Sequence, residues 1–163
     1  MSILVIAEHD NNSLKGATLN TVAAAVKLEQ DITVLIVGSE CGSVVTEAQT
    51  IDSISKVISV DNSSYKNFIA EELSALVLTI ANDFSYIMAP ATTFGKNLLP
   101  RISAKLDSQQ ISDIISIESD DTFKRPIYAG SCIATVKSND SIKVISVRST
   151  AFDAIGMSNS GVE

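Results

Sequence analysis

The sequence predicts an α/β fold with three layers, in which helices cover both faces of a mainly parallel five-stranded sheet. Short apolar runs alternate with segments of helical periodicity along the first 117 residues, and this alternation is typical of a parallel sheet. The runs are almost continuously apolar, as expected for strands that are buried on both faces. After residue 117, three strand-like segments follow one another without helices, which predicts an antiparallel β meander at the C-terminal end.

The strands of the parallel sheet are identified from the apolar runs. The first run reads ILVIA and the second reads ITVLIV, and both are rich in the branched residues that favour strands. Right-handed crossovers between such strands would give a Rossmann-like or adenine-nucleotide-hydrolase-like sheet. In chain order, the predicted strands are residues 3–7, 32–37, 56–60, 86–89 and 111–117.

Helices are expected between these strands, where apolar residues recur three and four positions apart. The pattern LNTVAAAV over residues 19–26 shows this spacing in the first helix. Thr18 should cap that helix, and Thr92 or Thr93 should cap the helix that follows the fourth strand. The other predicted helices cover residues 44–50 and 65–81, and the first extends over residues 18–28.

The meander completes the predicted domain, which covers residues 1–152. Its strands are separated by turn signals, AG at residues 129–130 and SND at residues 138–140. Residues 153–163 are mostly small and polar, and we expect them to form a linker toward a further domain. The strands of the meander are predicted at residues 122–128, 132–137 and 142–148.

The composition excludes several classes of protein. The chain has 163 residues, of which 45% are hydrophobic, enough for one folded core and too many for intrinsic disorder. Its net charge is −7 and its pI is about 4.6, so it lacks the basic cluster needed to bind nucleic acid or an anionic membrane. No apolar run approaches the ~20 residues of a membrane span. No targeting segment begins the chain, so a cytoplasmic location is expected.

The two cysteines, Cys41 and Cys132, lie far apart in the sequence and form no CxxC pair. Neither has a histidine beside it, so we expect neither a zinc site nor a redox-active dithiol. Both are expected to be buried free thiols in a reducing compartment.

The carboxyl ends of the parallel strands are where an open α/β sheet binds ligands. Thr92, Thr93, Gly95 and Lys96 follow the fourth strand at the start of a helix. Backbone N–H groups, hydroxyl groups and a lysine are suited there to a phosphate. Capping of the helix is the simpler explanation of the two threonines. No GxGxxG or GxxxxGK[ST] motif is present, so the sequence encodes no recognisable nucleotide site.

His9 is the only histidine, and it follows the first strand between Glu8 and Asp10. A histidine beside carboxylates at this edge of the sheet suits general acid or base chemistry. No serine or cysteine in a nucleophile motif accompanies it. A structural role is therefore favoured, and no catalytic residue is predicted.

Two basic residues are candidates for contact with a partner protein. Arg101 and Lys105 are four positions apart on a predicted helix, opposite its apolar face. They either face solvent or meet an acidic surface. Phe123, Tyr128 and Phe152 are expected in the core or in an interface rather than stacked on a flavin.

Several short motifs follow one another in the order and spacing of one known family, and their agreement extends over almost the whole chain. The motifs are VIAEH (5–9), TLNT (18–21), KNLLPR (96–101), AKL (104–106), ISDI (111–114), DTF (121–123), IYAG (127–130) and VISVRSTAF (144–152). On these residues the chain resembles the alpha subunit of electron transfer flavoprotein.

The resemblance implies the N-terminal domain of a subunit that pairs with a beta subunit, with one FAD in the heterodimer. It implies an electron carrier rather than an enzyme, which passes electrons from acyl-CoA and other dehydrogenases, as in fatty acid beta-oxidation, to the respiratory chain through a quinone oxidoreductase. Most FAD contacts of the family lie in a second domain that would follow residue 163. No FAD-binding residue is therefore assigned, and none of this cofactor is expected on this chain alone. A mitochondrial form would lie in the matrix after loss of a transit peptide.

Two other interpretations are open at this stage. A free-standing nucleotide-binding protein of the stress-response type would use the turn at residues 92–96 for phosphate. An enzyme would use His9 and the acids beside it. The structural and subunit-interface role that the resemblance implies accounts for more of the sequence than either alternative.

Overall fold

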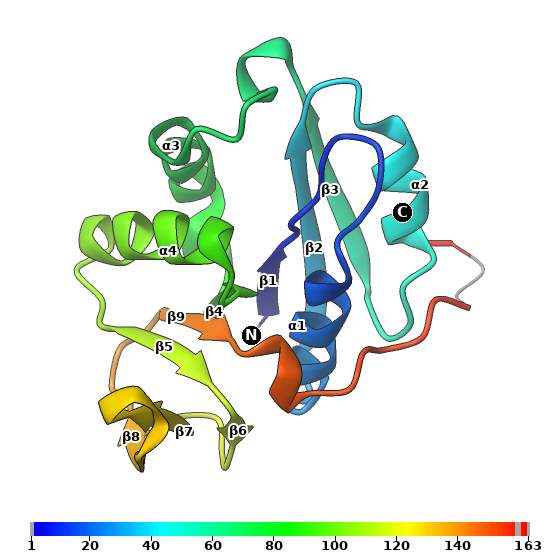
Figure 1. Ribbon diagram of the computed structural model, residues 1–163. Coiled ribbons are helices and arrows are strands. Elements are labelled where there is room, and N and C mark those ends of the chain that lie inside the picture. Colours follow the sequence, from blue (N-terminus) through cyan, green and yellow to red (C-terminus); the bar gives the residue numbers. More distant parts are fainter. Residues whose placement is uncertain (1, 159–160, 163) are drawn as a thin grey trace.

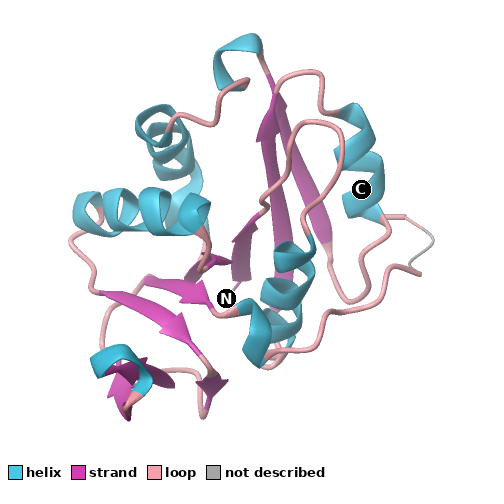
Figure 2. Ribbon diagram, viewed as in Figure 1, coloured by secondary structure: helices cyan, strands magenta, loops and turns pink. Residues whose placement is uncertain are grey.

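The computed structural model describes residues 2–158 and 161–162. Within them, a six-stranded sheet forms the centre, with α3 and α4 on one face and α1 and α2 on the other (Figure 1). Figure 2 shows a small three-stranded sheet beside it. The large sheet contains β1 (Ser2–Ile6), β2 (Asp31–Gly38), β3 (Lys56–Asp61), β4 (Tyr86–Pro90), β5 (Gln110–Ile114) and β9 (Lys143–Val147). The small sheet contains β6 (Ser116–Ile117), β7 (Thr122–Ile127) and β8 (Cys132–Lys137).

The described chain also contains four α-helices and four short 3-10 helices. The α-helices are α1 (Gly16–Val26), α2 (Gly42–Gln49), α3 (Ala70–Ile80) and α4 (Thr93–Lys105). The 3-10 helices are η1 (Ser63–Tyr65), η2 (Ala81–Asp83), η3 (Tyr128–Gly130) and η4 (Ser149–Ala151).

The large sheet has the strand order β3-β2-β1-β4-β9-β5, and all its pairings are parallel. The predicted three-layer α/β class is confirmed, with one strand more than the five expected. The additional strand is β9, so the prediction that it closes an antiparallel meander is wrong. Val144, Ile145 and Val147 have no exposed surface. A strand this apolar needs cover on both faces, which the interior of a parallel sheet provides.

The other two segments of the predicted meander do pair with each other. β7 and β8 are antiparallel, and β6 adds to the free side of β7. β6 belongs to the predicted fifth strand, which is divided between the two sheets. Asp113 has a left-handed backbone (φ 61°), and the register of β5 shifts between Ile111 and Ile114. This irregularity bends the chain out of the large sheet.

Alternate residues of the central strands supply two separate cores. In β1, Ile3 and Val5 contact the core shared with α1 and α2, whereas Leu4 and Ile6 contact the core shared with α3 and α4. All four are at most 1% exposed. Burial on both faces is the reason why these strands are unbroken apolar runs in the sequence. Phe123 and Phe152 join the first core, as expected.

Two predicted helix starts are displaced. α1 begins at Gly16, so Thr18 lies inside the helix and does not cap it. Its hydroxyl group donates to the carbonyl oxygen of Glu8 (3.2 Å) and ties the helix to the end of β1. α3 begins at Ala70, later than expected, because Phe68 has a left-handed backbone (φ 52°) that separates it from η1.

The described part of the predicted linker packs against the domain. The carbonyl oxygen of Gly156 accepts a hydrogen bond from Asp52 N (2.9 Å), and Ser158 donates to the Asp52 carboxylate through its N and Oγ atoms (3.0 and 2.9 Å). Ile155 is partly buried against the first core. The linker role of this segment stays a prediction, and residues 159–160 and 163 lie outside the described residues.

α4 starts very close to the end of β4. A Cβ atom on Gly95 would lie 2.0 Å from the carbonyl oxygen of Pro90, so only glycine allows this approach. The helix then continues through Pro100 to Lys105. The contact at Gly95 therefore fixes where the whole of α4 lies on the sheet.

Replacing Gly95 by alanine should lower the free energy of unfolding by about 1–3 kcal/mol, as overpacking does, because the Pro90 oxygen cannot move without moving β4. Urea denaturation measures this loss. Gly42→Ala is the matched control, since a Cβ atom there would meet nothing within 4 Å, and this variant should be as stable as the wild type or slightly more stable. Equal stability of the two variants would contradict the packing explanation.

Candidate functional site at the carboxyl edge of the sheet

Successive strands are added toward one side of β1 and then toward the other, so the order reverses between β1 and β4. Open α/β sheets bind ligands at the carboxyl ends of the strands at such a reversal point. Two side chains meet across this point. Thr92 Oγ1 donates to Glu8 Oε2 (2.8 Å), and Glu8 N donates to Thr18 Oγ1 (2.9 Å). The polar groups at the reversal point therefore bind one another and hold β1, α1 and the start of α4 together.

The four residues of the predicted anion site follow β4 as expected, but Thr92 and Gly95 contact other parts of the protein. Thr92 occupies the N-cap position of α4, yet its side chain makes no capping hydrogen bond. It is engaged with the Glu8 carboxylate, a neighbour that would repel a phosphate. Gly95 is buried against Pro90, while Thr93 and Lys96 are exposed. An anion site at these residues stays a prediction.

His9 is buried and has a backbone partner at each ring nitrogen. Nε2 lies 3.1 Å from the carbonyl oxygen of Val37, and Nδ1 accepts from Asn11 N (3.1 Å). A carbonyl can only accept and an N–H can only donate, so the ring is neutral with its proton on Nε2. The ring also packs edge-on against Phe68, with 5.0 Å between centroids. This arrangement suits a structural contact between the ends of β1 and β2 rather than proton transfer.

Gly38 makes room for this contact. A Cβ atom at Gly38 would lie 2.8 Å from His9 Cε1 and 2.3 Å from Asn11 Oδ1. Beside it, a polar pocket of about 440 Å³ opens at the carboxyl ends of β1 to β3. Its lining residues are Asp10, Asn11, Asn12, Ser39, Glu40, Ser63 and Lys66.

Acidic side chains at this edge serve backbone N–H groups. Asp61, the last residue of β3, accepts from Glu40 N (2.7 Å) and Cys41 N (3.0 Å) and so holds the turn that leads into α2. Asp10 pairs with Lys15 and accepts a hydrogen bond from Ser13 N (2.9 Å). These contacts hold the pKa of Asp10 below its usual range, and Lys15 has the largest effect. Both carboxylates shape loops.

An ion pair missed by the sequence analysis joins the ends of β5 and β9. Arg148 Nε donates to Asp113 Oδ1 (3.1 Å), and Arg148 Nη2 donates to Oδ2. Asp113 N also donates to Ser146 Oγ (2.7 Å). The Arg148 guanidinium holds the pKa of Asp113 below its usual range, with smaller contributions from Lys96 and Arg125, while burial opposes the shift. This pair stabilises the irregular turn of β5.

The two candidate contact residues lie on the exposed side of α4. Arg101 Nη2 pairs with Glu71 Oε1 of α3 (2.8 Å), and both side chains are well exposed. Lys105 is exposed in the last turn of the helix. Their role as partner contacts stays a prediction.

The most exposed large apolar side chains of the described chain lie at one end of the small sheet. Tyr128 is 79% exposed and Ile133 is 59% exposed. The backbone is left-handed at three successive residues, Tyr128, Ala129 and Gly130 (φ 49°, 53° and 90°). We call residues 128–133 the hairpin tip. Tyr128 therefore lies outside the core, and its place in an interface stays a prediction.

The prediction that both cysteines are buried holds for Cys41 and is wrong for Cys132. Cys41 is enclosed at the start of α2, where burial raises the pKa of its thiol. Cys132 starts β8, an edge strand of the small sheet, and is exposed. Both are free thiols, and residues 2–158 and 161–162 hold no group of three or more potential ligands suited to a metal ion. None of the helices in that part of the chain is long and apolar enough to span a membrane.

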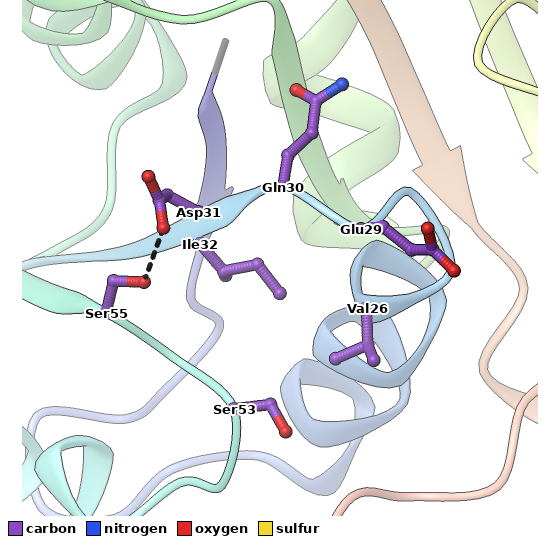
Figure 3. A pocket seen from close by; sticks show the side chains of 7 residues that line it. All are labelled: Val26, Glu29, Gln30, Asp31, Ile32, Ser53 and Ser55. Carbon is purple, nitrogen blue, oxygen red and sulfur yellow. Dashed lines mark hydrogen bonds between the residues drawn. The ribbon is translucent and has the colours of Figure 1, made fainter.

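A wide pocket of about 760 Å³ lies at the opposite, amino edge of the sheet (Figure 3). Glu29 and Asp31 make it acidic, and Asp31 accepts a hydrogen bond from Ser55 Oγ (3.3 Å). Gln30 points away from the other side chains drawn. The pocket is shallow and far from the loops that follow the strands, so it does not extend the candidate site.

Nearly the whole chain matches one known protein family. Residues 3–162 match the family described as the electron transfer flavoprotein domain. The chain belongs to this family. The match confirms the resemblance that the motifs indicated.

Relatives of this electron transfer flavoprotein domain are named as alpha subunits. The electron transfer flavoprotein subunit alpha of Pseudomonas aeruginosa is 50% identical over 155 residues, which are 95% of this chain and 50% of that protein. The mitochondrial subunit alpha of Dictyostelium discoideum is 44% identical over 92% of this chain and 44% of its own length. The subunit alpha of Paracoccus denitrificans is 41% identical over 96% and 51%. The chain thus spans about half the length of these curated relatives.

The stability of this domain should depend on pH through His9. Burial is the main cause that lowers the pKa of His9 in the folded chain, against opposing contributions from Val37 and Asp10. In the unfolded chain the histidine titrates near pH ~6.5. As the pH falls below about 6.5, the unfolded chain takes up a proton that the folded chain resists, so the free energy of unfolding should fall until the folded-state pKa is passed.

Urea denaturation at about pH 7.5 and about pH 5.5 measures this effect, since the chain has one histidine and free carboxylates titrate at lower pH. The wild type should lose stability between the two conditions, and His9→Gln should lose clearly less. A pH dependence of the same size in both proteins would show that another group is responsible.

Proposed function

We propose that the chain is the N-terminal domain of the alpha subunit of an electron transfer flavoprotein and packs against the beta subunit of the heterodimer. It provides a structural platform, while FAD is held elsewhere in the complex. The complex carries electrons from acyl-CoA and other dehydrogenases to a quinone oxidoreductase, in the bacterial cytoplasm or the mitochondrial matrix. The domain itself catalyses no reaction.

The hairpin tip is the observation that supports an interface role for this particular domain. Tyr128 and Ile133 expose large apolar surfaces, and aromatic and aliphatic side chains of this kind form the centres of interfaces. The left-handed backbone at Tyr128 and Ala129 is costly for residues with a Cβ atom. Such strain is typical of positions that are kept for function. We assign this tip to the contact with the beta subunit.

Arg101 and Lys105 are proposed as a second, polar contact. Both lie on the outer side of α4 of a chain whose net charge is −7. Arg101 already pairs with Glu71, so Lys105 contributes most of the attraction to an acidic surface on a partner. Exposed charges of this kind affect association rates more than affinity. The tip should therefore contribute most of the binding energy.

The flavin is assigned to a part of the complex outside this chain. The polar groups at the reversal point of the sheet are engaged with one another: Thr92 with Glu8, and Thr18 with Glu8. The ring nitrogens of His9 are engaged with the backbone. This argues for a supporting role of the carboxyl edge. The family assignment gives no support to a free-standing nucleotide-binding protein that uses residues 92–96.

The interface is tested by titrating the tagged chain with the electron transfer flavoprotein beta subunit of the same organism. Ile133→Lys should weaken binding at least tenfold, about 1.4 kcal/mol, because it places a charge in an apolar contact. Ile69→Lys is the matched control, since Ile69 is also exposed (43%) but lies just before α3, and it should bind like the wild type. Wild-type affinity of Ile133→Lys would remove the tip from the interface, and no binding by the wild type would contradict the platform role.

The purified 163-residue chain should be colourless after dialysis, because no flavin site is assigned to it. Visible absorption spectroscopy measures this directly. Added AMP or ATP should leave its melting temperature unchanged, since only a ligand that binds the folded state raises it. A flavin band that survives dialysis, or a nucleotide-dependent rise in melting temperature, would contradict the proposal.

A further inference from the structure

A pocket between β5 and the small sheet is independent of both the carboxyl edge and the hairpin tip. Its volume is about 340 Å³, at the lower end of the range for small-molecule sites. Ile111 of β5 and Val136 of β8 are its apolar side chains, and Arg125 of β7 adds a guanidinium group. The other lining residues are polar, namely Gln109, Gln110, Lys137, Ser138, Asn139 and Asp140.

Arg125 is the cation of this pocket that lacks an acceptor. Its Nε atom is buried and has no hydrogen-bond partner in the described chain. The charge of Arg125 helps to lower the pKa of Asp113, but among residues 2–158 and 161–162 its guanidinium group belongs to no ion pair. An unpaired donor of a charged group in a partly buried position destabilises the fold. The buried Nε atom cannot contact a ligand directly. A ligand would therefore accept hydrogen bonds from the terminal nitrogens of Arg125.

The charged neighbours of Arg125 are already engaged. The Asp113 carboxylate accepts two hydrogen bonds from Arg148. Lys137 pairs with Asp121 (2.9 Å). Asp140 Oδ2 accepts from Gln109 N (2.8 Å). Arg125 is therefore the one cation of the described pocket lining that is in no ion pair, and Asp140 adds a negative charge to the same lining.

These charges select the class of ligand. A guanidinium fork matches a carboxylate or a phosphate in shape. One free cation balances a single negative charge, whereas the second charge of a phosphate would meet the Asp140 carboxylate. The apolar walls at Ile111 and Val136 suit a short hydrocarbon chain. We propose that this pocket binds a short-chain monocarboxylate, with the terminal nitrogens of Arg125 donating to its carboxylate and its alkyl chain against Ile111 and Val136.

Methyl NMR of the 163-residue chain tests the site with butyrate as the probe. The methyl signals of Ile111 and Val136 should shift and saturate as butyrate is added. Butyramide, which has the same shape without the charge, should bind at least tenfold more weakly. Arg125→Met, which keeps an apolar stem, should also weaken butyrate binding at least tenfold. Lys56→Met removes an exposed cation outside the pocket and should bind like the wild type.

A second variant keeps the test decisive if Arg125→Met does not fold. Arg125→Lys retains the charge but loses the planar fork, and it should weaken butyrate binding several-fold. Unmoved methyl signals in the wild type, equal binding of butyramide, or wild-type affinity in the Arg125 variants would overturn the site. Inorganic phosphate binding more tightly than butyrate would overturn its assignment to a monocarboxylate.

Discussion

Parallel pairing throughout the large sheet requires that the chain return to the same end after every strand, and each return places a segment on one face of the sheet. Four helices cover the two faces of the described sheet, so the central strands have no side that faces water. The loops that leave the strands consequently gather at one edge. The contacts of His9 with Val37 and of Thr92 with Glu8 follow from that gathering, because they join the ends of neighbouring strands.

The sequence was sufficient to locate the first four strands and most of the helices, since two-sided burial leaves long apolar runs such as ILVIA and ITVLIV. It was not sufficient to place β9. The residues of β9 form a run of the same kind, but a turn signal before a strand is compatible with a hairpin or with a return to a distant partner. The pairing of β9 with β4 and β5 depends on contacts between remote parts of the chain, which no local pattern records.

In the candidate site, too, local sequence patterns do not reveal contacts between distant residues. His9 could be judged structural because no nucleophile motif accompanies it, and its backbone contacts agree with that judgement. The partners of Thr92 and Asp113 could not be predicted, because Glu8 and Arg148 are 84 and 35 residues away from them. Thr18 was assigned as a cap from its place before an apolar pattern, but its hydroxyl group binds Glu8 instead. For Thr18, a tertiary contact thus outweighs the local capping preference.

The position of β9 has a consequence for synthesis of the chain. Although β9 follows every other strand of these two sheets in the sequence, it lies between β4 and β5. A growing chain that has not reached Lys143 can pair β1 to β4, but it leaves the outer side of β4 open and gives β5 no neighbour in that sheet. Open apolar strand edges are sites of aggregation. This domain should therefore be most prone to aggregation late in its synthesis, before β9 fills the gap between β4 and β5.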